Sequence, residues 1–121
     1  MKLAWTDFLL RWGAAGFVVL ALFNAADVQA EPTGERAYAL NHLVRQDCGS
    51  CHGLRLTGGI GPALTPRALA DRSRDSLVAT ILHGRPGTPM PPWSPFLNED
   101  EAGWIVDQLQ HGYPENLADA H

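Results

Sequence analysis

The residues most suited to chemistry are Cys48-Gly49-Ser50-Cys51-His52. Two thiols three residues apart, following a predicted helix, can each add to a vinyl group of one porphyrin, and the next residue, His52, can then ligate the iron. This C-x-x-C-H pattern is the attachment signature of haem c. The sequence therefore predicts one covalent haem c, bonded to Cys48 and Cys51, with His52 as an axial ligand of the iron.

Three other interpretations of this motif compete with haem attachment. A thioredoxin-like redox pair is typical of a βαβ context, and the sequence has no strand-like run. A zinc site needs two more ligands at short spacing, and the chain has no second C-x-x-C or C-x-x-H. A chance match is the third alternative. The chain holds only two cysteines, the number that one haem c requires.

The second axial position of the iron has several candidates, of which Met90 is favoured. Met90 lies in Gly87-Thr88-Pro89-Met90-Pro91-Pro92, where the prolines restrict the backbone and would hold a thioether in place. A lone methionine usually fills a core gap, but this one is outside any helical stripe. The alternatives are an open position or one of the other histidines: His42, His83, His111 and His121.

A glycine-rich loop follows the motif, in Gly58-Gly59-Ile60-Gly61-Pro62. A histidine that ligates a metal usually donates its other ring N–H to a second acceptor. The backbone carbonyl of Pro62 is the expected acceptor for His52. An ordinary connecting loop is the alternative.

The first thirty residues are expected to be a signal peptide and residues 31–121 the domain. Lys2 and Arg11 flank the start, residues 12–26 carry no charge, and Val28-Gln29-Ala30 offers a cleavage site. The uncharged stretch is shorter than the roughly twenty residues of a membrane span. We therefore expect a periplasmic protein without a stable membrane anchor after cleavage; an uncleaved N-terminal anchor is the alternative.

The composition of residues 31–121 describes a small domain with many loops. All nine prolines of the chain lie there, and the formal net charge of −4 argues against nucleic-acid binding. A domain of this size buries little core of its own. We expect the haem to complete the core and the chain without haem to be largely unfolded.

The charges of residues 31–121 are segregated along the chain. Residues 36–85 hold all seven arginines, whereas residues 86–121 hold six acidic residues and no basic one. Solvated helix faces are one interpretation of this pattern. A dipolar surface that orients the molecule toward a partner is the other.

Apolar periodicity and capping residues predict short helices and no strand, so the expected class is all-α. The helices are expected over residues 34–47, from Pro66 to about Asp71, from Ser73 to Gly84, and from Asn98 to about Gln110. Thr65, Ser73 and Asn98 are the expected N-caps, the last in a capping box with Glu101. Residues 85–95 contain five prolines and are expected to form a loop.

In this order the elements resemble the class I monohaem cytochromes c, over residues 34–110. The resemblance implies short helices around one haem, with Pro62 accepting from the proximal histidine and Met90 as distal ligand. It also implies a crossing of the first and last helices, with Ala37, Val44, Trp104 and Ile105 as candidates for that contact. Val44 stands where members of the family often have an aromatic residue.

Residues 45–54, 58–66 and 81–93 resemble more closely the NirC-type periplasmic cytochromes c, which are associated with the haem c/haem d1 nitrite reductase of denitrifying bacteria. This resemblance implies a monomeric electron carrier that serves the reductase. An accessory redox role in haem d1 biosynthesis or maturation of the reductase is the alternative. A peroxidase-like or gas-binding enzyme with an open iron position is a third hypothesis. Ile60, Gly61 and Pro91 are candidates for a docking patch near the exposed haem edge.

Overall fold

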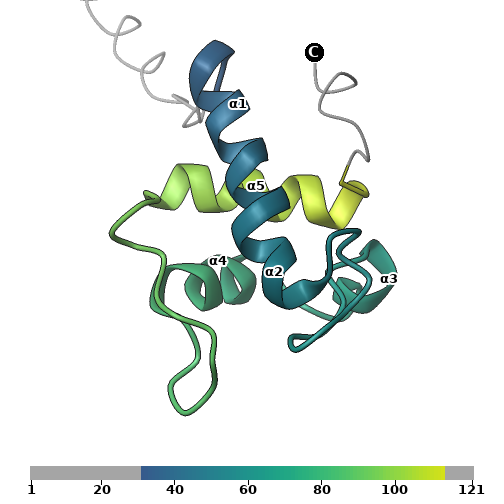
Figure 1. The fold of residues 1–121 in the computed structure, drawn as a ribbon. Helices are drawn as coiled ribbons and strands as arrows, with labels where there is room; N and C mark the ends of the chain where they lie inside the picture. Colours follow the sequence, from purple (N-terminus) through teal and green to yellow (C-terminus); the bar gives the residue numbers. More distant parts are fainter. Residues whose placement is uncertain (1–30, 114–121) are drawn as a thin grey trace, which may run out of the picture.

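The computed structural model describes residues 31–113, and every regular element in that range is helical (Figure 1). The elements are α1 (Gly34–Leu43), a π-helical turn η1 (Val44–Cys48), α2 (Gly49–His52), α3 (Pro66–Leu69), α4 (Arg74–His83) and α5 (Glu99–His111). The all-α class is thereby confirmed. The predicted signal peptide, residues 1–30, lies outside the described residues and stays a prediction.

The first helix is longer than expected, because it does not stop at Asp47. It continues through η1 and α2 as far as His52, with Gly49 still in the right-handed helical region. The helix ends at Gly53, which has φ +89°, and a Cβ there would lie 2.6 Å from the Gly58 carbonyl oxygen. The two cysteines and the histidine therefore belong to the last turns of the helix and not to a loop after it.

The other helices begin at the predicted caps. The side chain of Thr65 accepts a hydrogen bond from the Ala68 amide, and that of Ser73 accepts one from the Ser76 amide, both at 3.3 Å. Asn98 and Glu101 form the predicted capping box at the start of α5. The ends differ slightly from expectation, since α3 stops at Leu69 rather than near Asp71 and α5 reaches His111.

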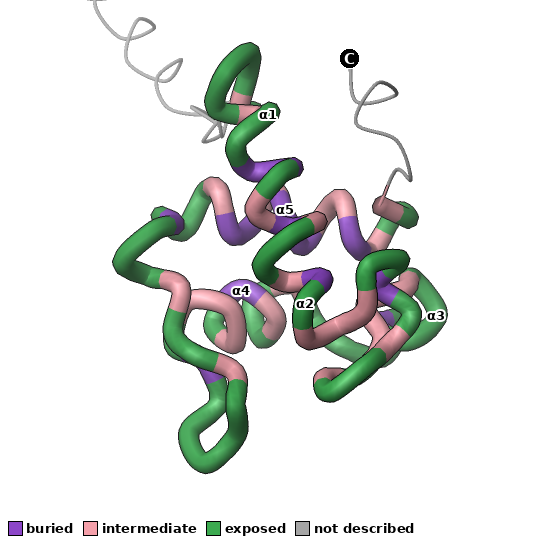
Figure 2. Tube along the Cα trace, in the orientation of Figure 1, coloured by how far each residue is buried: buried purple, intermediate pink, exposed green. Residues whose placement is uncertain are grey.

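The main core lies where α1 and η1 cross α5 (Figure 1). Val44 and Ile105 are both buried there, as expected of the helix crossing, whereas Ala37 and Trp104 are half-buried. The buried residues of this cluster are Leu40, Val44, Leu56, Leu69, Leu97, Ile105 and Leu109. A second buried cluster, formed by Val78, Ala102 and Val106, joins α4 to α5. Figure 2 shows that burial concentrates along these helices, while the long loops are mostly exposed.

Part of the charge segregation is explained by ion pairs between elements. Arg36 of α1 pairs with Glu101 of α5 at 2.5 Å, and Arg74 of α4 pairs with Asp107 of α5 at 2.8 Å. In each pair a base from the arginine-rich stretch meets an acid from the C-terminal stretch. These four charges are therefore neither a free dipolar surface nor isolated solvated groups.

None of the helices within residues 31–113 combines the length and the apolar character that a membrane crossing requires.

Candidate haem site

Cys48 and Cys51 lie one helical turn apart at the end of the first helix, and both are free thiols. Cys48 packs against the main core, and burial, followed by the nearby Asp47, raises its pKa to about 11. The reactive thiol of a dithiol redox protein has a lowered pKa instead. This difference argues against a thioredoxin-like pair, and both free thiols are available for covalent attachment.

The imidazole of His52 is held in one tautomer by the chain itself. Its Nδ1 lies 2.7 Å from the backbone carbonyl oxygen of Pro62. Because a carbonyl oxygen can only accept, Nδ1 carries the proton and donates it. In this tautomer the lone pair is on Nε2, the nitrogen that is left for a metal. The contact is the one expected from the sequence.

The loop after His52 is fastened to the end of the helix by backbone hydrogen bonds. The Gly58 amide donates to the His52 carbonyl and the Gly61 amide donates to the Cys51 carbonyl, each at 2.8 Å. A Cβ on Gly61 would lie 2.7 Å from Cε1 and 2.8 Å from Nδ1 of the His52 ring. The backbone of Gly61 thus rests directly on the imidazole, which only a glycine permits. The loop orients the ring and is more than a connection.

Met90 is half-buried in the loop between α4 and α5, which we call the Met90 loop (residues 84–98). A turn within this loop is closed by the Arg85 amide, which donates to the Met90 carbonyl at 3.1 Å. The Thr88 amide and hydroxyl both donate to the Arg85 carbonyl, at 3.0 and 2.7 Å. Local hydrogen bonds therefore restrict the residue in addition to its flanking prolines.

The Met90 loop is also attached to the end of α4. The amides of Trp93 and Ser94 donate to the carbonyls of Ile81 and Leu82, at 3.0 and 3.2 Å. Gly84, which is buried and has φ +66°, permits this close return, because a Cβ there would lie within 2.6–2.8 Å of backbone atoms of Met90, Pro91 and Pro92. The loop therefore folds back on α4 through a glycine, as the loop after His52 does on its own helix.

The competing histidines lie in less suitable surroundings. His42, His83 and His111 are exposed, and Nδ1 of His111 contacts the Asp107 carbonyl at 2.7 Å. His121 lies outside the described residues. Within residues 31–113, the structure has no group of three or more His, Cys, Asp or Glu side chains able to hold a metal ion by themselves.

The donor set fits a haem c. Two free thiols at C-x-x-C spacing, one imidazole with Nε2 available and one half-buried thioether are the groups that such a cofactor uses. His52 and Pro62 are in direct contact, whereas Met90 comes from a separate segment. Figure 1 shows the Met90 loop and the loop after α2 on the same side of the crossing between α1 and α5. The sequence did not single out Gly61 as the residue that packs on the His52 ring.

Comparisons with known proteins agree with this chemistry. Residues 35–108 match the protein family described as cytochrome C oxidase, cbb3-type, subunit III. Cytochrome c55X of Pseudomonas aeruginosa is 65% identical over 110 residues, which cover 88% of this chain and 92% of that protein. The solved structure of a c-type cytochrome NirC superposes with a TM-score of 0.66 and 63% identity, covering 68% of this chain and 96% of that one.

A larger protein contains a related region. Dihydro-heme d1 dehydrogenase of Pseudomonas aeruginosa is 33% identical over 99 residues, which cover 82% of this chain but 19% of that protein. The similarity thus concerns one part of the enzyme. The family match spans most of residues 31–113, and the cytochrome c55X relative is covered almost completely. The chain therefore belongs to this family of cytochromes c. It is a small class I electron-transfer cytochrome with one covalent haem c, similar to cytochrome c55X and NirC.

Proposed function

We propose that this cytochrome is a periplasmic electron carrier whose haem is bonded to Cys48 and Cys51 and ligated by His52 and Met90. When bound, the haem supplies a one-electron Fe(III)/Fe(II) couple. The observation that carries the proposal is the donation from His52 Nδ1 to the Pro62 carbonyl, which reserves Nε2 for the iron. The hydrogen-bonded Met90 loop supports the second ligand.

In this proposal the polypeptide holds the side chains of His52 and Met90 in fixed positions. Pro62 and Gly61 fix the imidazole, and the bonds from Trp93 and Ser94 to α4 fix the segment that follows Met90. Ligands that keep their places in both oxidation states keep the reorganisation on electron transfer small. Filling both axial positions leaves no place for a substrate, which favours a carrier over a peroxidase or a gas-binding protein.

The surface near the site suits a transient partner. Ile60 is 80% exposed and Leu54 72% exposed, both on the loop after His52, and Pro91 is exposed beside Met90. Small, weakly polar contact areas are typical of short-lived redox complexes. Ile60, Gly61 and Pro91 remain our candidates for the docking patch of a monomeric carrier.

The acceptor that we propose is a haem c/haem d1 nitrite reductase of the denitrification pathway. The support is the likeness to a NirC-type cytochrome. The test is rapid mixing of the reduced protein with the purified oxidised reductase, followed by the haem absorbance of each. Fast oxidation of the carrier with matching reduction of the enzyme is expected, and failure of the two proteins to exchange electrons would reject this acceptor.

A second candidate function is an accessory redox role in haem d1 biosynthesis or in maturation of the reductase. The likeness to one part of dihydro-heme d1 dehydrogenase favours it. Deletion of the gene separates the two. A reductase that is loaded with d1 haem but slowly reduced supports the carrier, whereas a reductase that lacks d1 haem supports the accessory role.

A further inference from the structure

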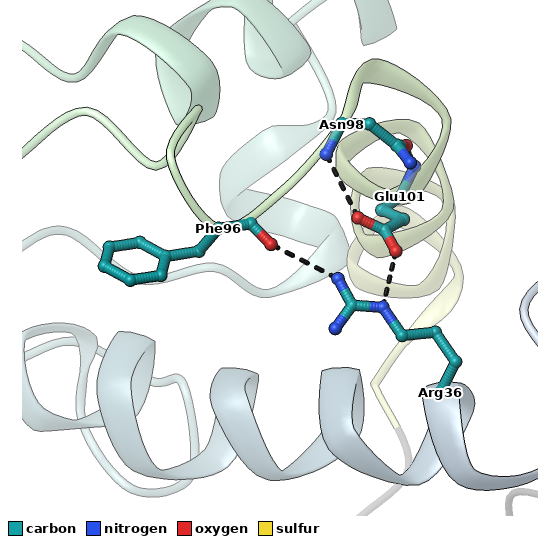
Figure 3. Close-up of polar contacts among 4 residues, drawn as sticks. All are labelled: Arg36, Phe96, Asn98 and Glu101. Atoms are coloured by element: carbon teal, nitrogen blue, oxygen red, sulfur yellow. Dashed lines mark hydrogen bonds and ion pairs between the residues drawn. The ribbon is translucent and has the colours of Figure 1, made fainter.

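The side chain of Arg36 joins three parts of the fold (Figure 3). Its Nε donates to Oε1 of Glu101 at 2.5 Å, and its Nη2 donates to the backbone carbonyl of Phe96 at 3.2 Å. Arg36 is on α1, Glu101 is in the first turn of α5, and Phe96 is near the end of the Met90 loop. One guanidinium therefore holds two acceptors that lie sixty or more residues away in sequence.

The acceptor Glu101 is itself fixed to the Met90 loop. Its Oε2 accepts from the Asn98 amide at 3.0 Å, while its own amide donates to Oδ1 of Asn98 at 2.9 Å. Both carboxylate oxygens are thus engaged, one by the loop and one by Arg36. The hydrogen bond from Arg36 is the main reason that the pKa of Glu101 lies below its usual range, so the carboxylate is charged at neutral pH.

Arg36 and His52 share one helical segment, because α1 continues through η1 into α2. Phe96 and Asn98, in turn, end the loop that carries Met90. Arg36 therefore connects the segment of the proposed proximal ligand to the segment of the proposed distal ligand. The other attachment of the loop is to α4, through the carbonyls of Ile81 and Leu82.

We propose that Arg36 is a positioning residue for Met90: by clamping the end of the Met90 loop to the helix that carries His52, it keeps the thioether on the iron against competing ligands. The inference rests on the proposed ligation by Met90. Without the clamp, the loop is held at its α4 end and by the Asn98 cap, and it opens more often. An external ligand would then replace the thioether more easily.

The chain supplies a matched control in its second ion pair. Arg74 of α4 donates to Oδ1 and Oδ2 of Asp107 at 2.8 and 3.1 Å. It joins two helices and pairs with α5 as Arg36 does, but neither partner belongs to α1 or to the Met90 loop. Loss of this pair would lower stability without releasing Met90.

The experiment is a titration of the oxidised holoprotein with imidazole, a small ligand that competes with the thioether, in wild type, Arg36→Gln, Arg36→Lys and Arg74→Gln. We expect Arg36→Gln to raise the imidazole affinity by about fivefold, in the range of a partly exposed ion pair with an added hydrogen bond. Arg74→Gln should stay within about twofold of wild type. Arg36→Lys should lie between, because an ammonium does not reproduce the fork that reaches both acceptors.

An equal affinity for imidazole in Arg36→Gln and Arg74→Gln would overturn the clamp. If Arg36→Gln fails to fold, the comparison of Arg36→Lys with Arg74→Gln provides the same test.

The ligation by Met90 is tested separately, by the sulfur-to-iron charge-transfer band of the wild-type oxidised protein and its loss in Met90→Ala. A wild type without that band would refute Met90 as ligand and this inference with it, whereas a band present with unchanged Arg36 variants refutes the clamp alone.

Discussion

The two ligand-bearing segments are built in different ways. His52 is oriented by its own neighbourhood, since the contacts that fix it come from residues 53–62 and from the end of the same helix. Met90 is held by a loop whose attachments lie on α4, on α5 and on α1. The first arrangement needs one helix and one turn, whereas the second needs the assembled fold.

The position of Met90 therefore depends on the packing of several elements, whereas the orientation of His52 does not. A local opening that detaches the Met90 loop from α4, from the start of α5 or from Arg36 leaves the contact between His52 and Pro62 in place. Local opening costs less free energy than global unfolding wherever few contacts hold a segment. The distal ligand should therefore be the first to exchange, and the following changes test that order.

The largest effect is expected from removing the cofactor that both segments serve. The Cys48→Ala/Cys51→Ala chain has no covalent attachment and should be largely unfolded, because a domain this small buries too little core without haem. Far-ultraviolet circular dichroism and thermal melting measure this, with the wild-type holoprotein as reference. A cooperatively melting variant without haem would show that the polypeptide core is sufficient.

Gly84→Ala should displace the Met90 loop and leave the surroundings of His52 unchanged. Gly84 has φ +66°, and the new Cβ would lie 2.6–2.8 Å from backbone atoms of Met90, Pro91 and Pro92. These atoms can move away only if the whole loop is displaced. A loss of about 3 kcal/mol in unfolding free energy is expected, together with loss of the sulfur-to-iron band. Denaturant titration and the absorbance spectrum measure the two effects.

Gly87→Ala is the control for this substitution. Gly87 has φ +79° but no atom within 4 Å of an added Cβ, so only backbone strain of about 1 kcal/mol is expected. The band should survive. Should Gly84→Ala keep its band as Gly87→Ala does, the return of the loop onto α4 would not be what holds the thioether.

Gly61→Ala tests the histidine side in the same way. Its Cβ would lie 2.7–2.8 Å from atoms of the His52 ring, so the imidazole or the loop must shift. We expect a loss of about 2 kcal/mol and a disturbed haem spectrum, since the donation to Pro62 is weakened. A normal spectrum and unchanged stability would mean that the ring is oriented without the help of this loop.

The same contrast explains what could be predicted from the sequence. Cys48, Cys51 and His52 lie within one short motif, and the pairing of Asn98 with Glu101 spans three residues, so spacing indicated both. The role of Pro62 as acceptor came from the resemblance to the class I cytochromes c. The continuation of the helix to His52 was missed, because glycine and serine are poor helix formers and the apolar stripe ends at Val44. The contacts of Arg36 were missed because they join residues distant in sequence, and only packing brings these together.

The N-cap of α5 offers a smaller test at the end of the Met90 loop. Asn98→Ala removes the acceptor of the Glu101 amide and should cost about 1 kcal/mol, as should Ser73→Ala at the cap of α4. Denaturant titration should find the two losses similar. Imidazole affinity should rise in Asn98→Ala and stay unchanged in Ser73→Ala, because only the first cap adjoins the loop. Equal affinities would show that the cap stabilises α5 without helping Met90.

The smallest effect is a pH dependence that comes from Glu101. Its pKa is lowered below the ordinary 4.5, chiefly by the hydrogen bond from Arg36 and also by the Asn98 amide, against the opposing effect of burial. A group with a lowered folded-state pKa binds fewer protons in the folded than in the unfolded protein, so its stabilisation is complete above the unfolded pKa and is lost as the pH falls through the folded one. The stability difference between wild type and Glu101→Gln should therefore be constant near neutral pH and shrink below about pH 4.5. Asp107→Asn, which breaks the other ion pair, separates the loss of a charge on α5 from the loss of the clamp: at neutral pH, imidazole affinity should rise in Glu101→Gln and stay within about twofold of wild type in Asp107→Asn. A difference between wild type and Glu101→Gln that stays the same down to the lowest pH at which both fold would mean that the carboxylate charge contributes nothing to holding the loop.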